Sequence, residues 1–181
     1  MEINKLKNIL EAVLLASERT LSVVQIEALF ELDEERPTRD EIRQALHEME
    51  EDYQARGMEL KQVASGYRLQ VRQEFSTWVG RLWEEKPARY TRALLETMAL
   101  IAYRQPITRG EIEEVRGVSV SSNIIKTLLE RDWIKVLGHK DVPGKPTLYG
   151  TTKEFLDYFN LKKLDELPTL AEIKDLDTIH P

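Results

Sequence analysis

The stretch that decides the fold is residues 91–117, TRALLETMALIAYRQPITRGEIEEVRG. Apolar residues recur at helical spacing through its first half, and Pro106 then ends the helix because proline lacks the amide hydrogen that a helix needs. Thr108 and Glu111 have the spacing of a capping box, which predicts the start of a second helix, and Gly117 is placed to end it. The stretch therefore predicts two helices joined by a tight turn.

The same order of elements occurs twice in the chain. Ala16–Ser22 and Ala102–Thr108 each follow an amphipathic helix and lead to a short acidic helix. In the first half, Thr38 and Glu41 repeat the capping-box spacing and start a longer helix that we expect to end near Gly57. A hairpin and an aromatic segment follow in both halves. The order predicts two tandem winged-helix domains, and so an α+β protein that is mostly helical.

Four segments follow from this repeat. We expect a first domain at 1–85, a linker at 86–90, a second domain at 91–160 and a tail at 161–181. The linker interrupts the helical pattern with a proline and charged residues. The tail carries 5 acidic and 3 basic residues among regularly spaced leucines and isoleucines. Such a tail is either mobile or docked on a domain by its weak apolar face.

The first domain is expected to end with a hairpin and a closing helix. Apolar and polar residues alternate in the arms 58–61 and 67–72, which flank a turn at Ser65 and Gly66. The short helix that follows is expected to close the core with Phe75, Trp78, Val79 and Leu82.

The second domain is expected to repeat this plan. We predict a helix at 119–131, a strand at 133–137 that begins with a core tryptophan, a wing loop at 138–146 and a return strand from Leu148. The residues expected to face inward are Ile124, Ile125, Leu128 and Leu129 of the helix and, at the end of the domain, Phe155, Leu156, Tyr158 and Phe159.

Composition indicates a water-soluble protein of the cytoplasm. Of the 181 residues, 41% are hydrophobic and 32% are charged, which is ordinary for a globular chain. No apolar run approaches the ~18 residues of a membrane span, and residues 1–5 do not resemble a signal peptide. The absence of cysteine excludes disulfides and thiolate chemistry, as suits a reducing compartment. We expect no membrane association.

The charge distribution argues against strong binding of DNA. Residues 1–90 carry 13 basic and 18 acidic groups, and residues 91–160 carry 10 and 9. Binding to phosphates requires clustered lysine and arginine, because the affinity arises from the release of counterions. The helix at 38–56, which a winged-helix domain would place in the major groove, carries six acidic groups against three arginines. Only the second wing, with Lys135, Lys140 and Lys145, is modestly positive.

The sequence also lacks a pattern that would indicate catalysis. The histidines at 47, 139 and 180 are far apart and have no neighbouring ligand at metal-site spacing. The segment 138–146 resembles a phosphate-binding loop, but its glycine spacing is too long and Pro146 replaces the required serine or threonine. The serines at 119–122 have no histidine nearby. We expect no enzyme activity, no cofactor and no metal.

The second domain resembles a known family. The runs that carry the resemblance are ALLETMALIAYRQPITRGEIE at 93–113, RGV at 116–118, LLER at 128–131, PGKP at 143–146, LYGTT at 148–152 and FL at 155–156. They closely resemble segregation and condensation protein B (ScpB), the non-kleisin subunit of bacterial condensin. The likeness is long and specific over 91–160. In the first domain it concerns the order of helices and strands more than the residues themselves. Lys145 stands where arginine is frequent in the family.

The resemblance implies a function as well as a fold. It implies a non-catalytic adaptor that forms a homodimer through its N-terminal domains and binds the kleisin ScpA, which joins the SMC ATPase in chromosome condensation and segregation. It implies a cytoplasmic, nucleoid-associated protein that touches DNA only weakly or indirectly. It also implies that the C-terminal domain engages the kleisin, and the matching residues are Tyr103, Gln105, Pro106, Ile107, Thr108, Arg109, Glu113 and Arg116.

Two other interpretations remain open on the sequence. A winged-helix transcriptional regulator would bind a DNA operator tightly at physiological salt. A ligand sensor would need a large apolar pocket between the domains. For residues 105–108 there is a structural alternative as well, because this stretch ends one helix and caps the next.

Overall fold

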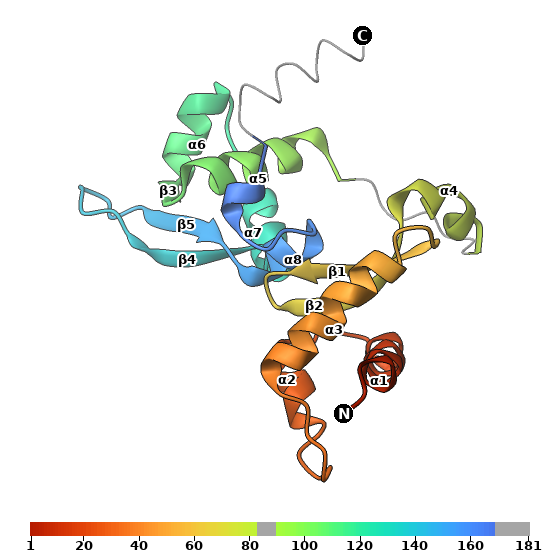
Figure 1. Cartoon of the computed structure of the whole chain (residues 1–181). Helices are drawn as coiled ribbons and strands as arrows, with labels where there is room; N and C mark the ends of the chain where they lie inside the picture. Colours follow the sequence, from red (N-terminus) through yellow and green to blue (C-terminus); the bar gives the residue numbers. More distant parts are fainter. Residues whose placement is uncertain (83–89, 169–181) are drawn as a thin grey trace. The chain divides into compact units, whose positions relative to one another are not determined.

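The computed structural model describes residues 1–82 and 90–168. The chain divides into two compact units, Met1–Lys86 and Pro87–Pro181, and each is described here by itself. Residues 86–89 of the predicted linker and 169–181 of the predicted tail lie outside the described residues. Both units combine helices with short antiparallel strands, in agreement with the predicted mixture of helix and sheet (Figure 1).

The first unit consists of three helices followed by a hairpin. Its main elements are α1 (Ile3–Ala16), α2 (Val23–Ala28), α3 (Arg39–Asp52), β1 (Met58–Val63) and β2 (Gly66–Val71). Residues close in sequence fix the starts of α2 and α3, because each of these helices begins with a complete capping box. The predicted box of Thr38 and Glu41 is thereby confirmed. The hairpin pairs Met58 with Val71 and Val63 with Gly66, as the alternation of apolar and polar residues predicted.

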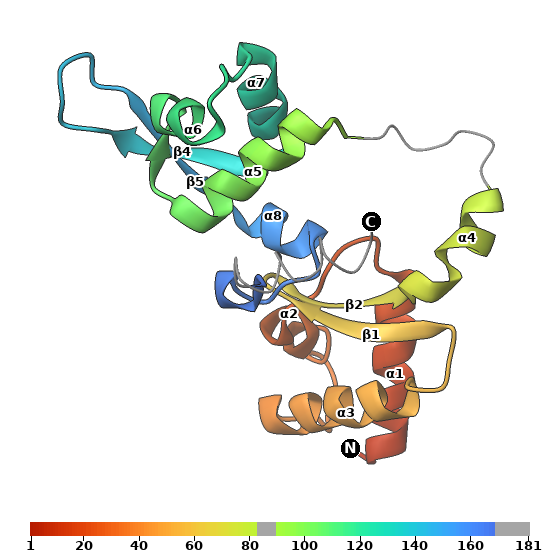
Figure 2. The same ribbon diagram turned by 90° about the horizontal axis from the view of Figure 1, so that it is seen from above.

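The core of the first unit is formed by α1, α2, α3 and the hairpin. Figure 2 shows how these elements are arranged. Residues four apart on α1 meet residues three and four apart on α3, since residues at these spacings share one helix face. The α1 side chains are Leu6, Leu10 and Leu14, and those of α3 are Ile42, Leu46 and Met49. Burial of a side chain of this kind contributes about 1.5–3 kcal/mol, so this layer holds the unit together.

The turn of this hairpin is pinned to the segment before α2. Leu21 and Tyr67 exchange backbone hydrogen bonds of 2.9 and 2.8 Å and form an isolated antiparallel bridge. Gly66 has φ of +148°, and a Cβ atom there would lie 2.3 Å from the Leu21 carbonyl oxygen. Only glycine permits this approach of two backbones. The bridge thus depends on the residue at 66.

The segment after β2 corrects one prediction. Gln73–Phe75, α4 (Ser76–Val79) and Gly80–Leu82 are three short helical turns. Of their apolar side chains, Trp78 and Leu82 are 61% and 77% exposed, Phe75 is also exposed, and Val79 is half-buried. The prediction that they close the core was wrong. Arg72 donates hydrogen bonds to the carbonyl oxygens of Tyr53, Gln54 and Arg56, and so fixes the start of this segment at the end of α3. Tyr53, Leu60 and Val63 are already buried in the unit.

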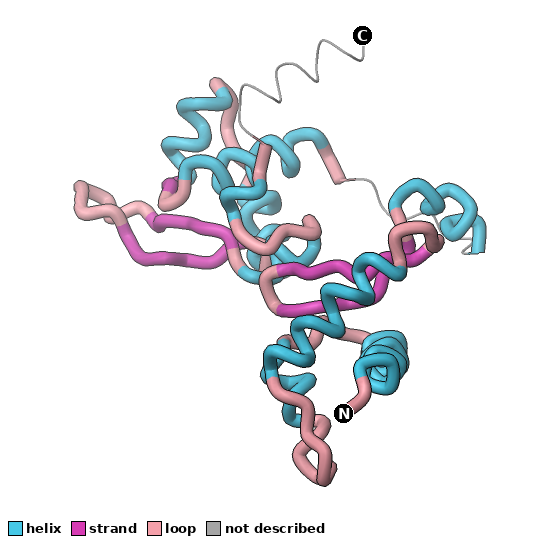
Figure 3. The backbone as a smooth tube through the Cα atoms, viewed as in Figure 1, coloured by secondary structure: helices cyan, strands magenta, loops and turns pink. Residues whose placement is uncertain are grey.

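The second unit repeats the order of elements and adds a strand. It contains α5 (Arg92–Arg104), β3 (Ile107–Thr108), α6 (Arg109–Arg116), α7 (Ser122–Glu130), β4 (Ile134–His139), β5 (Thr147–Thr151) and α8 (Lys153–Tyr158), with a helical turn at Leu164–Glu166. Its antiparallel sheet has the strand order β3-β5-β4, shown in magenta in Figure 3. The sequence did not predict β3. Helix α7 also begins three residues later than expected, because the Ser121 side chain caps it.

The core of the second unit gathers residues from every helix. Buried side chains include Met98, Ile101, Ile112, Leu128, Trp133, Ile134 and Phe155. The expectation that Trp133 belongs to the core is confirmed. Leu129 and Tyr158, expected inside, are 38% and 46% exposed, since Ile125 and Leu128 supply the inner face of α7. Leu161, Leu164 and Leu167 pack against this core, although the predicted domain ended at residue 160.

Among the described residues, no helix combines the length and apolar character needed to cross a membrane.

Candidate partner-binding surface

The eight residues implied by the family resemblance lie along one continuous stretch. They occupy the end of α5, the strand β3 and the helix α6. Most of them have an identifiable role inside the unit, and the following contacts show which side chains remain accessible to a partner.

Gln105 joins the end of α5 to the strand β5. Its side-chain oxygen accepts a hydrogen bond of 2.7 Å from the Thr151 amide, and its Nε2 donates to the Ala102 carbonyl at 3.2 Å. A Cβ atom at Gly150 would lie 2.8 Å from the same oxygen, so the strand must pass close to this side chain. Gln105 therefore serves the fold by fixing the turn that Pro106 begins.

Ile107 and Thr108 form β3 and the cap of α6. They pair with Tyr149 and Leu148 of β5, and both are buried. The Thr108 hydroxyl accepts from the Glu111 amide at 3.3 Å, while the Glu111 carboxylate accepts from the Thr108 amide at 2.8 Å. The predicted capping box is thus confirmed.

Glu111 receives a further contact from the second hairpin. Lys140 Nζ lies 2.5 Å from Glu111 Oε1. The Lys140 ammonium, together with the amide and hydroxyl of Thr108, lowers the pKa of the Glu111 carboxyl to about 2. One of the three wing lysines is therefore neutralised within the unit.

Glu113 and Arg109 connect α6 to the start of α7. The Glu113 carboxylate accepts from the Val120 amide at 2.8 Å and from Arg109 Nε at 3.1 Å. These two donors hold the pKa of Glu113 below its ordinary value, the Val120 amide being the larger cause. Arg109 also donates to the Ser122 hydroxyl at 3.1 Å. Both side chains therefore set the angle between the two helices.

Arg116 ties α6 to α5. Its guanidinium contacts the Glu96 carboxylate at 3.1 Å and the Thr97 hydroxyl at 3.4 Å, and the side chain is only 9% exposed. Its Nε is buried without a hydrogen-bond partner among the described residues. A partner would reach this side chain only at its margin.

Tyr103 and Pro106 complete the set. The Tyr103 hydroxyl donates to the Pro168 carbonyl, so it holds the chain that follows α8, and Pro106 is exposed. Among the eight residues, then, Pro106 and Arg109 are the exposed ones. Most residues of the motif that carries the resemblance therefore stabilise the fold of the second unit.

Sequence reasoning missed two accessible residues that lie between these positions, Glu114 and Val115. Together with Arg104, whose residue type is common at interfaces, they line a cavity of about 340 Å³. Its remaining walls are Pro106, Ile107 and Glu111. The only sequence signal for this groove was the exposed face of a predicted helix, which a sequence cannot distinguish from an ordinary solvated face.

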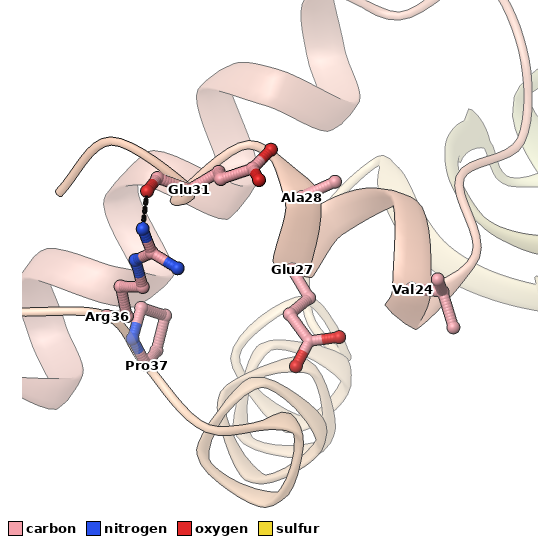
Figure 4. Close-up of a pocket in the computed structure, with 6 residues that line it drawn as sticks. All are labelled: Val24, Glu27, Ala28, Glu31, Arg36 and Pro37. Atoms are coloured by element: carbon pink, nitrogen blue, oxygen red, sulfur yellow. Dashed lines mark hydrogen bonds between the residues drawn. The ribbon is translucent and has the colours of Figure 1, made fainter.

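A second cavity lies on the first unit. It measures about 310 Å³ and is lined by Val24, Glu27, Ala28, Glu31, Arg36 and Pro37. Figure 4 shows Arg36 donating to the Glu31 backbone carbonyl across one end of it. The Glu27 carboxylate is paired with Arg39 at 2.6 Å. Two carboxylates thus make this cavity unsuited to a phosphate.

The basic residues of the helices α3 and α7 are largely occupied within the protein. Arg43 pairs with Asp40 at 2.7 Å, and Lys126 lies 3.6 Å from Glu130. The Arg131 guanidinium stacks over the rings of Tyr90 and Trp133, at 4.8 and 5.3 Å from their centroids. These helices therefore offer little unpaired positive charge to a nucleic acid.

Metal-binding side chains do not cluster in the described ranges: residues 1–82 and 90–168 hold no group of three or more His, Asp or Glu side chains arranged for a metal ion.

Fold and surface together define a class: a two-unit α+β protein in which the basic side chains of α3 and α7 are paired within the protein. The cavities described above are lined by both apolar and charged side chains. The chain belongs to the ScpB family, since the model of the segregation and condensation complex subunit ScpB matches residues 8–170. It is 61% identical over 174 residues to a segregation and condensation protein B homolog of Coxiella burnetii, covering 96% of this chain and 82% of that protein.

Other family members are less similar. Segregation and condensation protein B of Syntrophotalea carbinolica is 42% identical over 178 residues, which cover 97% of this chain and 87% of that protein. Among solved structures, ScpB from Mycobacterium tuberculosis is 30% identical and covers 89% of this chain and 98% of its own, with a TM-score of 0.42.

Proposed function

We propose that this protein is a non-catalytic adaptor of the bacterial condensin complex. It binds as a homodimer to the kleisin ScpA, which joins the SMC ATPase, and acts in chromosome condensation and segregation at the nucleoid in the cytoplasm. The observation that carries the proposal is the family match over residues 8–170, supported by 61% identity to a Coxiella burnetii relative.

Within this proposal, each unit is a winged-helix domain. The order of three helices and an antiparallel hairpin in both units supports it, as does the third strand that β3 adds in the second unit. The first domain ends before the linker at 86–90, and the second engages the kleisin through the surface around residues 103–116.

Dimer formation is assigned to the first unit. The most exposed large apolar side chains of the described residues lie on this unit: Leu15, Leu32, Trp78 and Leu82, each exposed by more than 60%. Removing such side chains from water in an interface between two copies would be favourable. The local chemistry therefore supports association of two copies through the first unit.

The alternative of a transcriptional regulator has less support. Binding in the major groove needs lysine and arginine on the second helix of a helix-turn-helix, free to reach phosphates and bases. Here Arg43 and Lys126 lie beside carboxylates of their own helices. We expect weak, salt-sensitive affinity for DNA at most.

Two measurements test the proposed function. Light scattering of the full chain at micromolar concentration should give the mass of a dimer, and the immobilised chain should retain the kleisin encoded by the same genome. A monomer that captures no kleisin, yet binds one operator duplex selectively at physiological salt, would replace the proposal with the regulator.

A further inference from the structure

The chain after α8 carries an apolar residue at every third position: Leu161, Leu164, Leu167, Leu170, Ile173 and Leu176. The first three of these side chains pack against the core of the second unit. Residues three apart share one edge of a 3₁₀ helix, and Leu164–Glu166 is a turn of this kind. The spacing that docks residues 161–167 thus continues in the sequence of residues 170–176, which lie beyond the described part of the chain.

The last described residue lies beside the C-terminal end of α5. This residue is Pro168, and its carbonyl oxygen accepts a hydrogen bond from the Tyr103 hydroxyl. The residue after Tyr103 is Arg104, which lines the cavity of about 340 Å³ formed by the end of α5, β3 and α6; we call this cavity the α5–α6 groove. Residues 169–173 can span up to about 16 Å, so they are long enough to reach across a cavity of this size.

The α5–α6 groove contains two unpaired charges of opposite sign. Arg104 on α5 and Glu114 on α6 are both exposed, and they form no hydrogen bond or ion pair within the described part of the chain. The third charged residue of the groove, Glu111, is already in an ion pair with the wing. The exposed apolar residues of the groove are Pro106 and Val115. A segment that fits the groove therefore needs an apolar edge with a charge of each sign beside it.

The sequence after Pro168 has this pattern. Glu172 and Lys174 stand on either side of Ile173. In a repeat of three residues per turn, the residues before and after an apolar position lie on opposite flanks of the apolar edge. An acidic flank complements Arg104, and a basic flank complements Glu114.

We propose that residues 169–176 dock in the α5–α6 groove of their own chain and cover it. Ile173 packs against Val115, and the two charges that flank Ile173 pair with the two unpaired charges of the groove. A partner that uses this surface must first displace the segment. The inference does not depend on the proposed function, because it concerns a single chain.

Covalent linkage favours a segment of the same chain over one from another molecule. The contact of Tyr103 with Pro168 holds the start of the segment near the groove, and a short linker of this kind gives an effective concentration in the millimolar range. Exposed ion pairs contribute only about 0.2–1 kcal/mol each, so a separate molecule with the same charges would bind weakly. The tail of a second copy is the competing occupant, and the test separates the two.

Disulfide trapping in the full chain tests the docking. The chain has no cysteine, so Val115→Cys combined with Ile173→Cys introduces its only two thiols. A disulfide forms only when the two Cα atoms come within about 4.4–6.8 Å of each other. With oxidised glutathione as the oxidant, we expect this pair to close within one chain at least about tenfold faster than a control pair, because the linker raises the local concentration only where the segment docks.

The control pair is Val136→Cys with Ile173→Cys. Val136 lies on β4 outside the groove, and it is 51% exposed, close to the 46% of Val115. The two pairs thus share the tail thiol and differ only in the surface that the tail must reach.

An exchange of charges tests the proposed pairing. Arg104→Glu should slow the trapping severalfold, because it places two carboxylates opposite each other, and the further change Glu172→Arg should restore the rate. Neither Arg104→Glu nor Val115→Cys should change the melting temperature before oxidation, since both positions are exposed.

The mass of the oxidised product under denaturing conditions separates the outcomes. A product with the mass of one chain supports the inference, whereas a product of twice that mass would place the tail of a second copy in the groove and overturn docking within one chain. Equal rates for the test and control pairs, or a slow rate that the charge exchange does not restore, would also overturn it. The assay contains no kleisin, so each of these results leaves the proposed function standing.

Discussion

Gly66→Ala tests the physical reasoning about the first unit most sharply. At this residue φ is +148°, and an added Cβ would lie 2.3 Å from the Leu21 carbonyl oxygen. Holding alanine in this conformation costs ~1–3 kcal/mol. Moving the chain away also breaks the two backbone bonds between Leu21 and Tyr67, each worth ~0.5–1.5 kcal/mol. The free energy of unfolding of the first unit should therefore fall by ~2–6 kcal/mol.

Urea denaturation measures this change. Because a domain is stable by only ~5–15 kcal/mol, a loss of this size should separate the unfolding of the first unit from that of the second. The control is Gly80→Ala, where an added Cβ would meet nothing within 4 Å and φ is −61°. That variant should be neutral or slightly more stable, since alanine reduces the entropy of the unfolded chain. If Gly66→Ala unfolds like wild type, the close approach of Leu21 and the strain at residue 66 have been misjudged.

Three further outcomes follow from named contacts. The pKa of Glu111 is lowered from 4.5 to about 2, so its contribution to stability is present above pH 4.5 and is lost as the pH falls toward 2. Glu111→Gln should therefore make the melting temperature depend less on pH in this acid range, and an equal dependence in both proteins would contradict the prediction. Trp78→Ser should leave the melting temperature of the first unit unchanged, since the ring is 61% exposed, while weakening the dimer in sedimentation; a large stability loss would mean that Trp78 is core. Arg116→Ala should lower the free energy of unfolding of the second unit by ~1–3 kcal/mol in urea, because it removes the contact with Glu96; no loss would show that α6 is held otherwise.

Local signals in the sequence predicted the elements well. The boxes at Thr38 and Thr108, the helix end at Pro106 and the first hairpin are set by residues close together in the chain, and all appear in the structure. The strand β3 was not predictable in this way. It has two residues, too few to show alternation, and exists because β5 pairs with it.

Two of the incorrect predictions have a common physical cause. Apolar residues at 75–82 looked like the lid of a core, as did Leu129, yet other side chains already fill those positions. Periodicity reports which face of an element is apolar and does not report whether the space opposite that face is filled.

The candidate site was only partly predictable for a related reason. The motif around Gln105, Thr108, Glu113 and Arg116 is conspicuous in sequence, and in the structure these side chains hydrogen-bond within their own unit. The unpaired charges at Arg104 and Glu114 appear only after the pairing of their neighbours is known, which requires tertiary contacts such as that of Lys140 with Glu111.

The most direct measurement for the whole account is titration calorimetry of the full chain with its kleisin and, separately, with double-stranded DNA at physiological salt. A protein in which the basic residues of α3 and α7 are paired internally should bind the kleisin with a Kd of ~1 µM or tighter and the duplex far more weakly. Tight binding of the duplex without any heat from the kleisin would contradict it.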